Sequence, residues 1–124
     1  MITTPKVYIV DDDESVRIGL SRLLRSAGYE IETFNSAQSF LDSVPADTKG
    51  ILILDIRMPD IDGFQLQAKL NSLSSRLQVI FITAHALAGD RERAMGAGAK
   101  GFLQKPFNDK SLLDLISSIT FERG

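Results

Sequence analysis

The sequence predicts an α/β fold in which an open parallel sheet carries helices on both faces. Two observations lead to this prediction. Short apolar runs and segments with helical spacing alternate five times along the chain, which is typical of repeated strand–helix units. Most of the apolar runs are also continuous, as in strands that are buried on both faces. With 124 residues, the chain has the length of one domain and can bury a core.

The strands are predicted from the short apolar runs. The second of them, EIETF, alternates apolar and polar residues, which is typical of a strand near the edge of a sheet. The others lack such alternation. In chain order, the predicted strands cover residues 7–10, 30–34, 51–54, 79–82 and 101–103.

The helices are predicted from apolar residues that recur every three to four positions. Asn35 or Ser36 suits the N-cap of the second helix, and Asn108 or Asp109 suits that of the fifth. Gly28 suits the position after the end of the first helix. The fourth helix has little apolar surface. The residues that mark the predicted helices lie within 16–27, 37–44, 64–73, 90–97 and 112–119, and the fifth helix begins directly after its cap.

The composition excludes several classes of protein. A hydrophobic content of 44% with 24% charged residues indicates a globular chain rather than a disordered one. The net charge of −2 gives no basic footprint for direct contact with nucleic acid. The absence of cysteine excludes disulfides and thiolate metal sites. Neither a signal peptide nor a membrane span is recognisable. We therefore expect one soluble, cytoplasmic domain over 1–124, with no second domain in this chain.

Polar side chains follow four of the five predicted strands. Asp11 and Asp12 follow the first strand, Asp55 the third, Thr83 the fourth and Lys105 the fifth. Ligands of open parallel sheets bind beyond the carboxyl ends of the strands. If these ends meet at one edge, carboxylates, a hydroxyl and an ammonium group converge there.

This set of groups has a chemical logic. Clustered carboxylates repel one another unless a cation lies between them. Oxygen ligands without His or Cys favour Mg²⁺. A bound cation together with a Lys and a Thr hydroxyl suits the transfer of a phosphoryl group. An aspartate, which is ionised at neutral pH, can accept that group as an aspartyl phosphate without a general base.

Four motifs carry a resemblance to a known family. They are IVDDDES, LDIRMPDIDG, VIFITAH and GAKGFLQKPF, in this order and spacing. Over residues 5–119 the chain resembles the receiver domain of two-component response regulators, and most of all the subgroup with LuxR-type output domains. The resemblance implies a flavodoxin-like (βα)5 fold with strand order 2-1-3-4-5. It also implies Mg²⁺-dependent phosphorylation of Asp55 by a sensor histidine kinase.

The resemblance also implies a set of metal ligands. Asp12 and Asp55 would bind Mg²⁺ directly, and Asp11 would bind it through water. The backbone carbonyl of Arg57 would complete the protein ligands. Mn²⁺ can substitute for Mg²⁺ in such sites.

Further roles follow from the same resemblance. The hydroxyl of Thr83 would swing toward the phosphoryl group, and Lys105 would pair with a phosphoryl oxygen. The peptide bond between Lys105 and Pro106 would be cis. Phe102 would change its exposure when Thr83 moves.

As a function, the resemblance implies a signalling switch in a phosphorelay that regulates transcription. Phosphorylation would shift the surface formed by the fourth helix, the fifth strand and the fifth helix. That surface would mediate homodimerisation or contact with an output domain, which this chain lacks. The domain would not be an enzyme beyond its own phosphorylation and dephosphorylation at Asp55, and it would contact neither nucleic acid nor membrane.

Each site residue also has a simpler structural interpretation. The acidic run suits the N-terminus of the first helix, and Thr83 suits the end of a strand. Lys105–Pro106 suits the end of another strand, and Phe102 suits the core. A third acid, Asp13, leaves open which two acids face the metal. The single histidine, His85, is expected to be an exposed loop residue.

Other functions remain in competition with the switch. One is a Mg²⁺ phosphohydrolase of the haloacid dehalogenase kind, which places a second Asp where Arg57 stands here. Another is a receiver-like module that is never phosphorylated. A dinucleotide site is rejected, because the GxGxxG match at 96–101 closes a predicted helix instead of opening one. Arg57 and His85 leave the lifetime of the phosphoryl group open.

Overall fold

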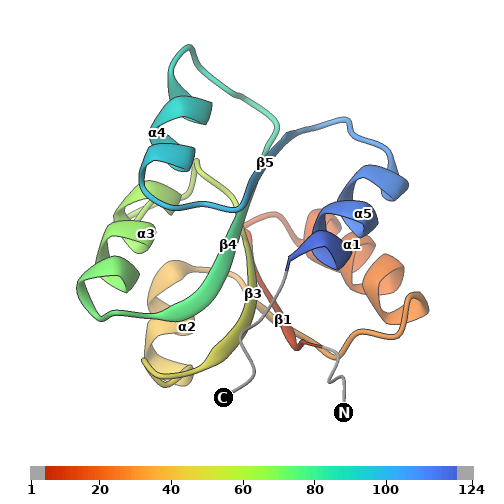
Figure 1. Ribbon diagram of the computed structural model, residues 1–124, viewed down its shortest axis with the longest axis horizontal. Helices are drawn as coiled ribbons and strands as arrows, with labels where there is room; N and C mark the ends of the chain where they lie inside the picture. Colours follow the sequence, from red (N-terminus) through yellow and green to blue (C-terminus); the bar gives the residue numbers. More distant parts are fainter. Residues whose placement is uncertain (1–4, 120–124) are drawn as a thin grey trace.

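A computed structural model describes residues 5–119, and it shows a parallel five-stranded sheet between two layers of helices (Figure 1). The strand order is β2-β1-β3-β4-β5, and every neighbouring pair is parallel, which confirms the predicted fold. The strands are β1 (Val7–Val10), β2 (Ile31–Phe34), β3 (Lys49–Leu54), β4 (Arg76–Thr83) and β5 (Gly101–Gln104). The helices are α1 (Glu14–Ser26), α2 (Ala37–Ser43), α3 (Gly63–Ser72), α4 (Asp90–Gly96) and α5 (Asp109–Ser118).

The two faces of the sheet bury separate hydrophobic clusters. Helices α1 and α5 cover one face, and α2, α3 and α4 cover the other (Figure 1). Along β1, Ile9 packs toward α1 and α5, whereas Val10 packs toward the opposite layer. Ile53 and Leu54 of β3 divide in the same way, because successive side chains of a strand point to opposite faces. Each continuous apolar run therefore contributes side chains to both hydrophobic clusters.

Several boundaries differ from those predicted. β4 begins at Arg76 because its pairing with β3 continues through the polar positions before the apolar run. α2 ends one residue early because Val44 has an extended backbone. β2 lies at an edge of the sheet, as its alternation predicted. No helix in residues 5–119 has both the length and the apolar character needed to cross a membrane.

The predicted caps and helix ends are largely found. Ser36 caps α2 and Asn108 caps α5, each through its side-chain oxygen. Gly28 follows the C-cap of α1 with a φ of 94°, a value that favours glycine. In the GxGxxG match, Gly96 ends α4 and Gly101 begins β5, so the motif does not open a helix.

Gly63, the first residue of α3, lies against the segment that carries the candidate phosphoacceptor. Its N–H donates to the carbonyl of Ile56 at 2.9 Å. A Cβ atom placed on Gly63 would lie 2.4 Å from the carbonyl oxygen of Asp55 and 3.0 Å from the Cα of Ile56. These backbone atoms cannot move aside as a flexible side chain can. The start of α3 therefore packs this closely against Asp55 and Ile56 only because residue 63 has no side chain.

We expect Gly63→Ala to destabilise the protein by about 2 kcal/mol, because the added methyl group forces this backbone apart. Gly19→Ala is the matched control. Gly19 lies within α1, and its added Cβ would contact nothing within 4 Å, so higher helix propensity should stabilise that variant by up to about 1 kcal/mol. Urea unfolding of both variants measures the difference. Equal effects on the free energy of unfolding would contradict the close approach at Gly63.

Candidate functional site

Backbone hydrogen bonds hold the carboxyl ends of the strands together beyond the last paired residues. The N–H of Asp55 donates to the carbonyl of Val10 at 3.1 Å. The N–H of Lys105 donates to the carbonyl of Thr83 at 2.8 Å. The residues that follow β1, β3, β4 and β5 therefore meet at one edge of the sheet, as the sequence predicted.

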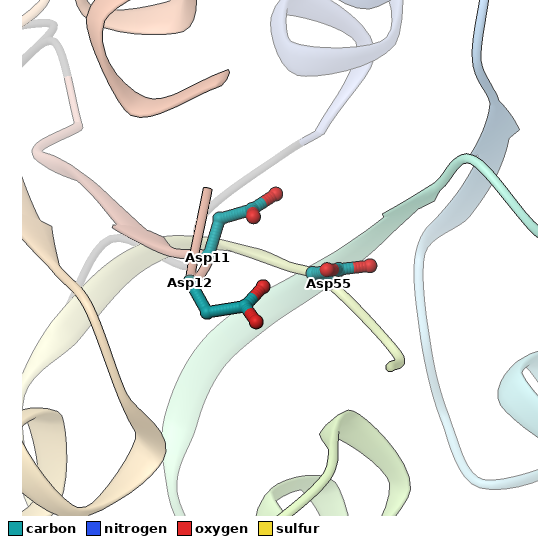
Figure 2. A group of neighbouring side chains, drawn as sticks. All are labelled: Asp11, Asp12 and Asp55. Carbon is teal, nitrogen blue, oxygen red and sulfur yellow. The ribbon is translucent and has the colours of Figure 1, made fainter. Parts of the chain in front are cut away.

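Three carboxylates gather at this edge. One carboxylate oxygen from each of Asp11, Asp12 and Asp55 lies within 4.8 Å of the others. Figure 2 shows the side chains of Asp11 and Asp12, directly after β1, extending toward Asp55 at the end of β3. Asp11 is buried, Asp55 is partly buried and Asp12 is exposed. The cluster is thus open to solvent on the side of Asp12.

The carboxylate of Asp11 is fixed through both of its oxygens. Oδ1 accepts a hydrogen bond from the N–H of Asp13 at 2.9 Å. Oδ2 accepts one from Nζ of Lys105 at 3.4 Å. Arg17 adds a third link, because its guanidinium donates to the Asp11 carbonyl at 2.7 Å. Lys105 thus lies against the acidic cluster, and Asp11 is less free than Asp12 to bind a cation directly.

Asp13 has a different task. Its carboxylate caps α1 by accepting hydrogen bonds from the N–H groups of Ser15 and Val16. The two acids that face Asp55 are therefore Asp11 and Asp12, which answers the question that the run of three acids left open.

The carboxylates perturb one another's protonation. Burial, followed by the nearby negative charge of Asp11, raises the pKa of Asp55 to about 6, although the charge of Lys105 acts in the opposite direction. Burial also raises the pKa of Asp11, against the hydrogen bond from the Asp13 backbone and the charge of Lys105. The charge of Lys105 therefore does not outweigh the effect of burial on the pKa of either carboxyl group.

The cluster fits a divalent cation. Its donors are carboxylate oxygens alone, which are hard ligands, and one oxygen from each of the three residues lies within 4.8 Å of the others. A cation at this position would remove the mutual repulsion. The acidic cluster can therefore bind a divalent metal ion.

The other predicted residues lie on β4 and β5 and in the loops that follow these strands. Thr83 is buried at the end of β4, and its Oγ1 accepts a hydrogen bond from the N–H of His85 at 3.3 Å. His85 is exposed, as expected for a loop residue. The Lys105–Pro106 bond is cis, as the resemblance implies. Phe102 is buried in the cluster between the sheet and the layer of α2, α3 and α4.

One contact was not predicted from the sequence. The guanidinium of Arg57, in the loop after β3, forms an ion pair with Asp90, the first residue of α4. The sequence indicates no partner for the side chain of Arg57. The two residues are 33 positions apart, and no local pattern joins charges at such a distance.

Comparison with known proteins finds relatives that match most of this chain. Nodulation protein W of Bradyrhizobium diazoefficiens is 41% identical over 114 residues, which are 92% of this chain and 50% of that protein. The transcriptional regulatory protein FixJ of the same organism is 37% identical over 118 residues, which are 95% of this chain and 58% of that protein. The chain thus spans about half the length of these curated relatives.

A solved structure and a family model lead to the same conclusion. The structure of response regulator StyR superposes with a TM-score of 0.86 and 48% identity, covering 94% of this chain and 59% of that one. The model of the response regulator receiver domain matches residues 7–117. The chain therefore belongs to the family of response regulator receiver domains, regulatory domains of phosphorylation-dependent signalling.

Proposed function

We propose that the chain is a switch in which Asp55 accepts a phosphoryl group from a sensor histidine kinase in a Mg²⁺-dependent reaction. The observation that carries this proposal is the meeting of Asp11, Asp12 and Asp55 at one edge of the sheet, with Lys105 against them. This is the charge arrangement that a phosphoryl group in transfer requires.

The roles that we propose for the site residues are those that the family resemblance implies. Asp12 and Asp55 would bind Mg²⁺ together with the backbone carbonyl of Arg57, while Asp11 binds through water. When bound, Mg²⁺ supplies the positive charge that offsets the phosphoryl oxygens, and Mn²⁺ can take its place. A carboxylate oxygen of Asp55 attacks phosphorus, and the bond from phosphorus to the donor nitrogen of the kinase histidine breaks.

Lys105 and Thr83 would then engage the new group. Lys105, now paired with Asp11, would turn to a phosphoryl oxygen, and the Thr83 hydroxyl would leave the N–H of His85 and do the same. Phe102 would follow Thr83, and the surface of α4, β5 and α5 would shift. A local change in charge that shifts a distant surface between two states is a common form of switching.

For the whole protein, we propose regulation of transcription. FixJ is a transcriptional regulatory protein by name, and the chain spans 58% of its length. In this proposal residues 1–124 form a single receiver domain. Their α4–β5–α5 surface controls homodimerisation or an output domain that lies outside the chain, and the receiver itself contacts no nucleic acid.

The rival functions fit the site less well. A phosphohydrolase of the haloacid dehalogenase kind needs a carboxylate where Arg57 stands, and the side chain of Arg57 is engaged with Asp90. A module that is never phosphorylated gives no reason for the carboxylates of Asp11, Asp12 and Asp55 to gather within 4.8 Å of one another. Autodephosphorylation at Asp55 is the only turnover that we propose.

Acetyl phosphate tests the proposed function without a kinase. With Mg²⁺ present, intact-protein mass spectrometry should show one added phosphoryl group on the parent and none on Asp55→Asn. Beryllofluoride, a stable mimic of the phosphoryl group, should bind the parent under the same conditions. The proposal fails if neither reagent binds, whereas rapid multiple turnover of a phosphomonoester would favour the hydrolase.

Asp12→Asn should lower the affinity for Mg²⁺ by about 100-fold, because it removes a direct, solvent-facing ligand. Asp13→Asn is the matched control, since it removes the same charge one residue later but keeps an N-cap side chain. The rise of the melting temperature with Mg²⁺ concentration measures both affinities. Equal losses in the two variants would mean that overall charge, and not the cluster, attracts the ion.

A further inference from the structure

Helix α4 has few contacts that hold its N-terminal end. It contains seven residues, of which only Asp90 and Ala94 are buried. Its N-cap is Gly89, in a left-handed conformation and without a side-chain capping bond. A helix this short gains little stability from its own hydrogen bonds. Its position therefore depends on contacts with neighbouring segments, which in its first turn include a hydrogen bond from the guanidinium of Arg91 to the carbonyl of Phe102 at 3.3 Å.

Asp90 makes two of these contacts with a single oxygen. Its Oδ2 accepts hydrogen bonds from the guanidinium of Arg57 and, at 2.8 Å, from the N–H of Leu87. Arg57 stands two positions after Asp55, and Leu87 lies in the loop between Thr83 and α4. The side chain of Asp90 is 10% exposed and that of Arg57 is 39% exposed. One carboxylate thus ties the loop after β3, the loop after β4 and the start of α4 together.

The other end of α4 is held by contacts with α3: the guanidinium of Arg93 lies 4.1 Å from the centre of the Phe64 ring, and two side-chain amides donate to backbone carbonyls. The side-chain amide of Asn71 on α3 donates to the carbonyl of Ala97 at 2.9 Å. That of Gln67 donates to the carbonyl of Ala94 at 3.4 Å. A change of charge next to Arg57 would leave these amide contacts in place. The N-terminal end of α4 is therefore the end that responds to the charge of the phosphorylation loop.

We propose that the Arg57–Asp90 ion pair is a latch that holds α4 and its preceding loop in the unphosphorylated position. This inference rests on the proposed function. A phosphoryl group on Asp55 places a multiply charged anion two residues from Arg57, and guanidinium groups pair strongly with such anions. It would therefore compete with Asp90 for Arg57. Release of Asp90 would weaken its hydrogen bond with the N–H of Leu87. The loop before α4 and the first turn of α4 would then become freer to move together.

The latch makes the unphosphorylated state more stable, so its loss must favour the phosphorylated state by the same free energy. Asp90→Asn removes the charge but keeps an oxygen that can accept from Leu87. Arg57→Gln removes the other charge at an exposed position, where the fold is not at risk, and leaves the backbone carbonyl in place. Glu92→Gln, an exposed acid of the same first turn, is the matched control.

Hydrogen exchange of the unphosphorylated protein tests the latch without any phosphoryl group. Amides of residues 84–93 should exchange about five- to tenfold faster in Asp90→Asn and in Arg57→Gln, and no faster in the double variant than in either single one. Glu92→Gln should exchange like the parent. Unchanged exchange in both single variants would overturn the latch.

Beryllofluoride then tests the coupling to the site. Both latch variants should bind it about five- to tenfold more tightly than the parent in the presence of Mg²⁺, and Glu92→Gln should match the parent. Faster exchange with unchanged affinity would overturn the latch as part of the switch. Failure of the parent itself to bind beryllofluoride would contradict the proposed function instead, and the exchange data separate the two failures.

Discussion

Asp55→Asn is expected to abolish phosphorylation and, in the absence of metal, to stabilise the fold by about 1–2 kcal/mol at neutral pH. The pKa of Asp55 is raised first by burial and then by the charge of Asp11. The ionised form of Asp55 therefore lowers the free energy of unfolding. Asparagine keeps the shape and removes the charge. The full pKa displacement corresponds to at most about 3 kcal/mol, and partial exposure of the site reduces this figure. Urea unfolding with a chelator measures the difference.

The pH dependence of this difference has a definite sign. The pKa of Asp55 is about 6 in the folded protein against an ordinary 3.8, so between these values the folded protein binds more protons than the unfolded chain. The protonated carboxyl group of Asp55 therefore contributes its full stability below about pH 3.8, and this contribution is lost as the pH rises through about 6. Asp55→Asn should therefore differ little from the parent near pH 4 and most above pH 6. If the gain in stability of Asp55→Asn over the parent were greatest in acid, this explanation would be contradicted.

Lys105→Met is expected to slow phosphorylation by acetyl phosphate about 100- to 1,000-fold, because it removes the cation positioned for the phosphoryl oxygens. Its Nζ lies 3.4 Å from Oδ2 of Asp11, and its charge opposes the rise in the pKa of Asp55. The substitution should therefore also raise that pKa further. The initial rate of formation of the phosphorylated species, measured by intact mass, tests the prediction.

Lys110→Met is the matched control for this measurement. Lys110 carries the same charge on α5, but it is exposed and pairs with Asp114 four residues later. We expect it to be phosphorylated at the rate of the parent. If both variants slowed equally, general attraction of the anionic donor, and not the position of Lys105, would explain the effect.

The fold and the acidic cluster could be predicted because both depend on local patterns. Continuous apolar runs mark buried parallel strands, and the residues after such strands share one edge of the sheet. Asp11, Asp12 and Asp55 each follow an apolar run in the sequence, and the structure brings their carboxylates together. The start of β4 could not be predicted from such a pattern, since its first residues are polar and are held by pairing with β3.

Contacts between distant polar residues could not be predicted. Arg57 lies in the loop after β3 and Asp90 begins α4, and the two side chains meet only in the folded structure. Gly63 follows Pro and Asp residues that are typical of a turn, and its close approach to the Asp55 backbone is visible only in three dimensions. Both features depend on how α3 and α4 dock on the sheet, which the periodicity of either helix does not encode.

The most direct test of the central claim is to locate the phosphoryl group chemically. After reaction with acetyl phosphate and Mg²⁺, borohydride reduces an acyl phosphate on aspartate to the alcohol of homoserine, which peptide mass spectrometry can place. We predict homoserine at Asp55 and unmodified side chains at Asp11 and Asp12. Homoserine at Asp11 or Asp12, or none at all in a protein that carries the added mass, would contradict the assignment of Asp55 as the phosphoacceptor.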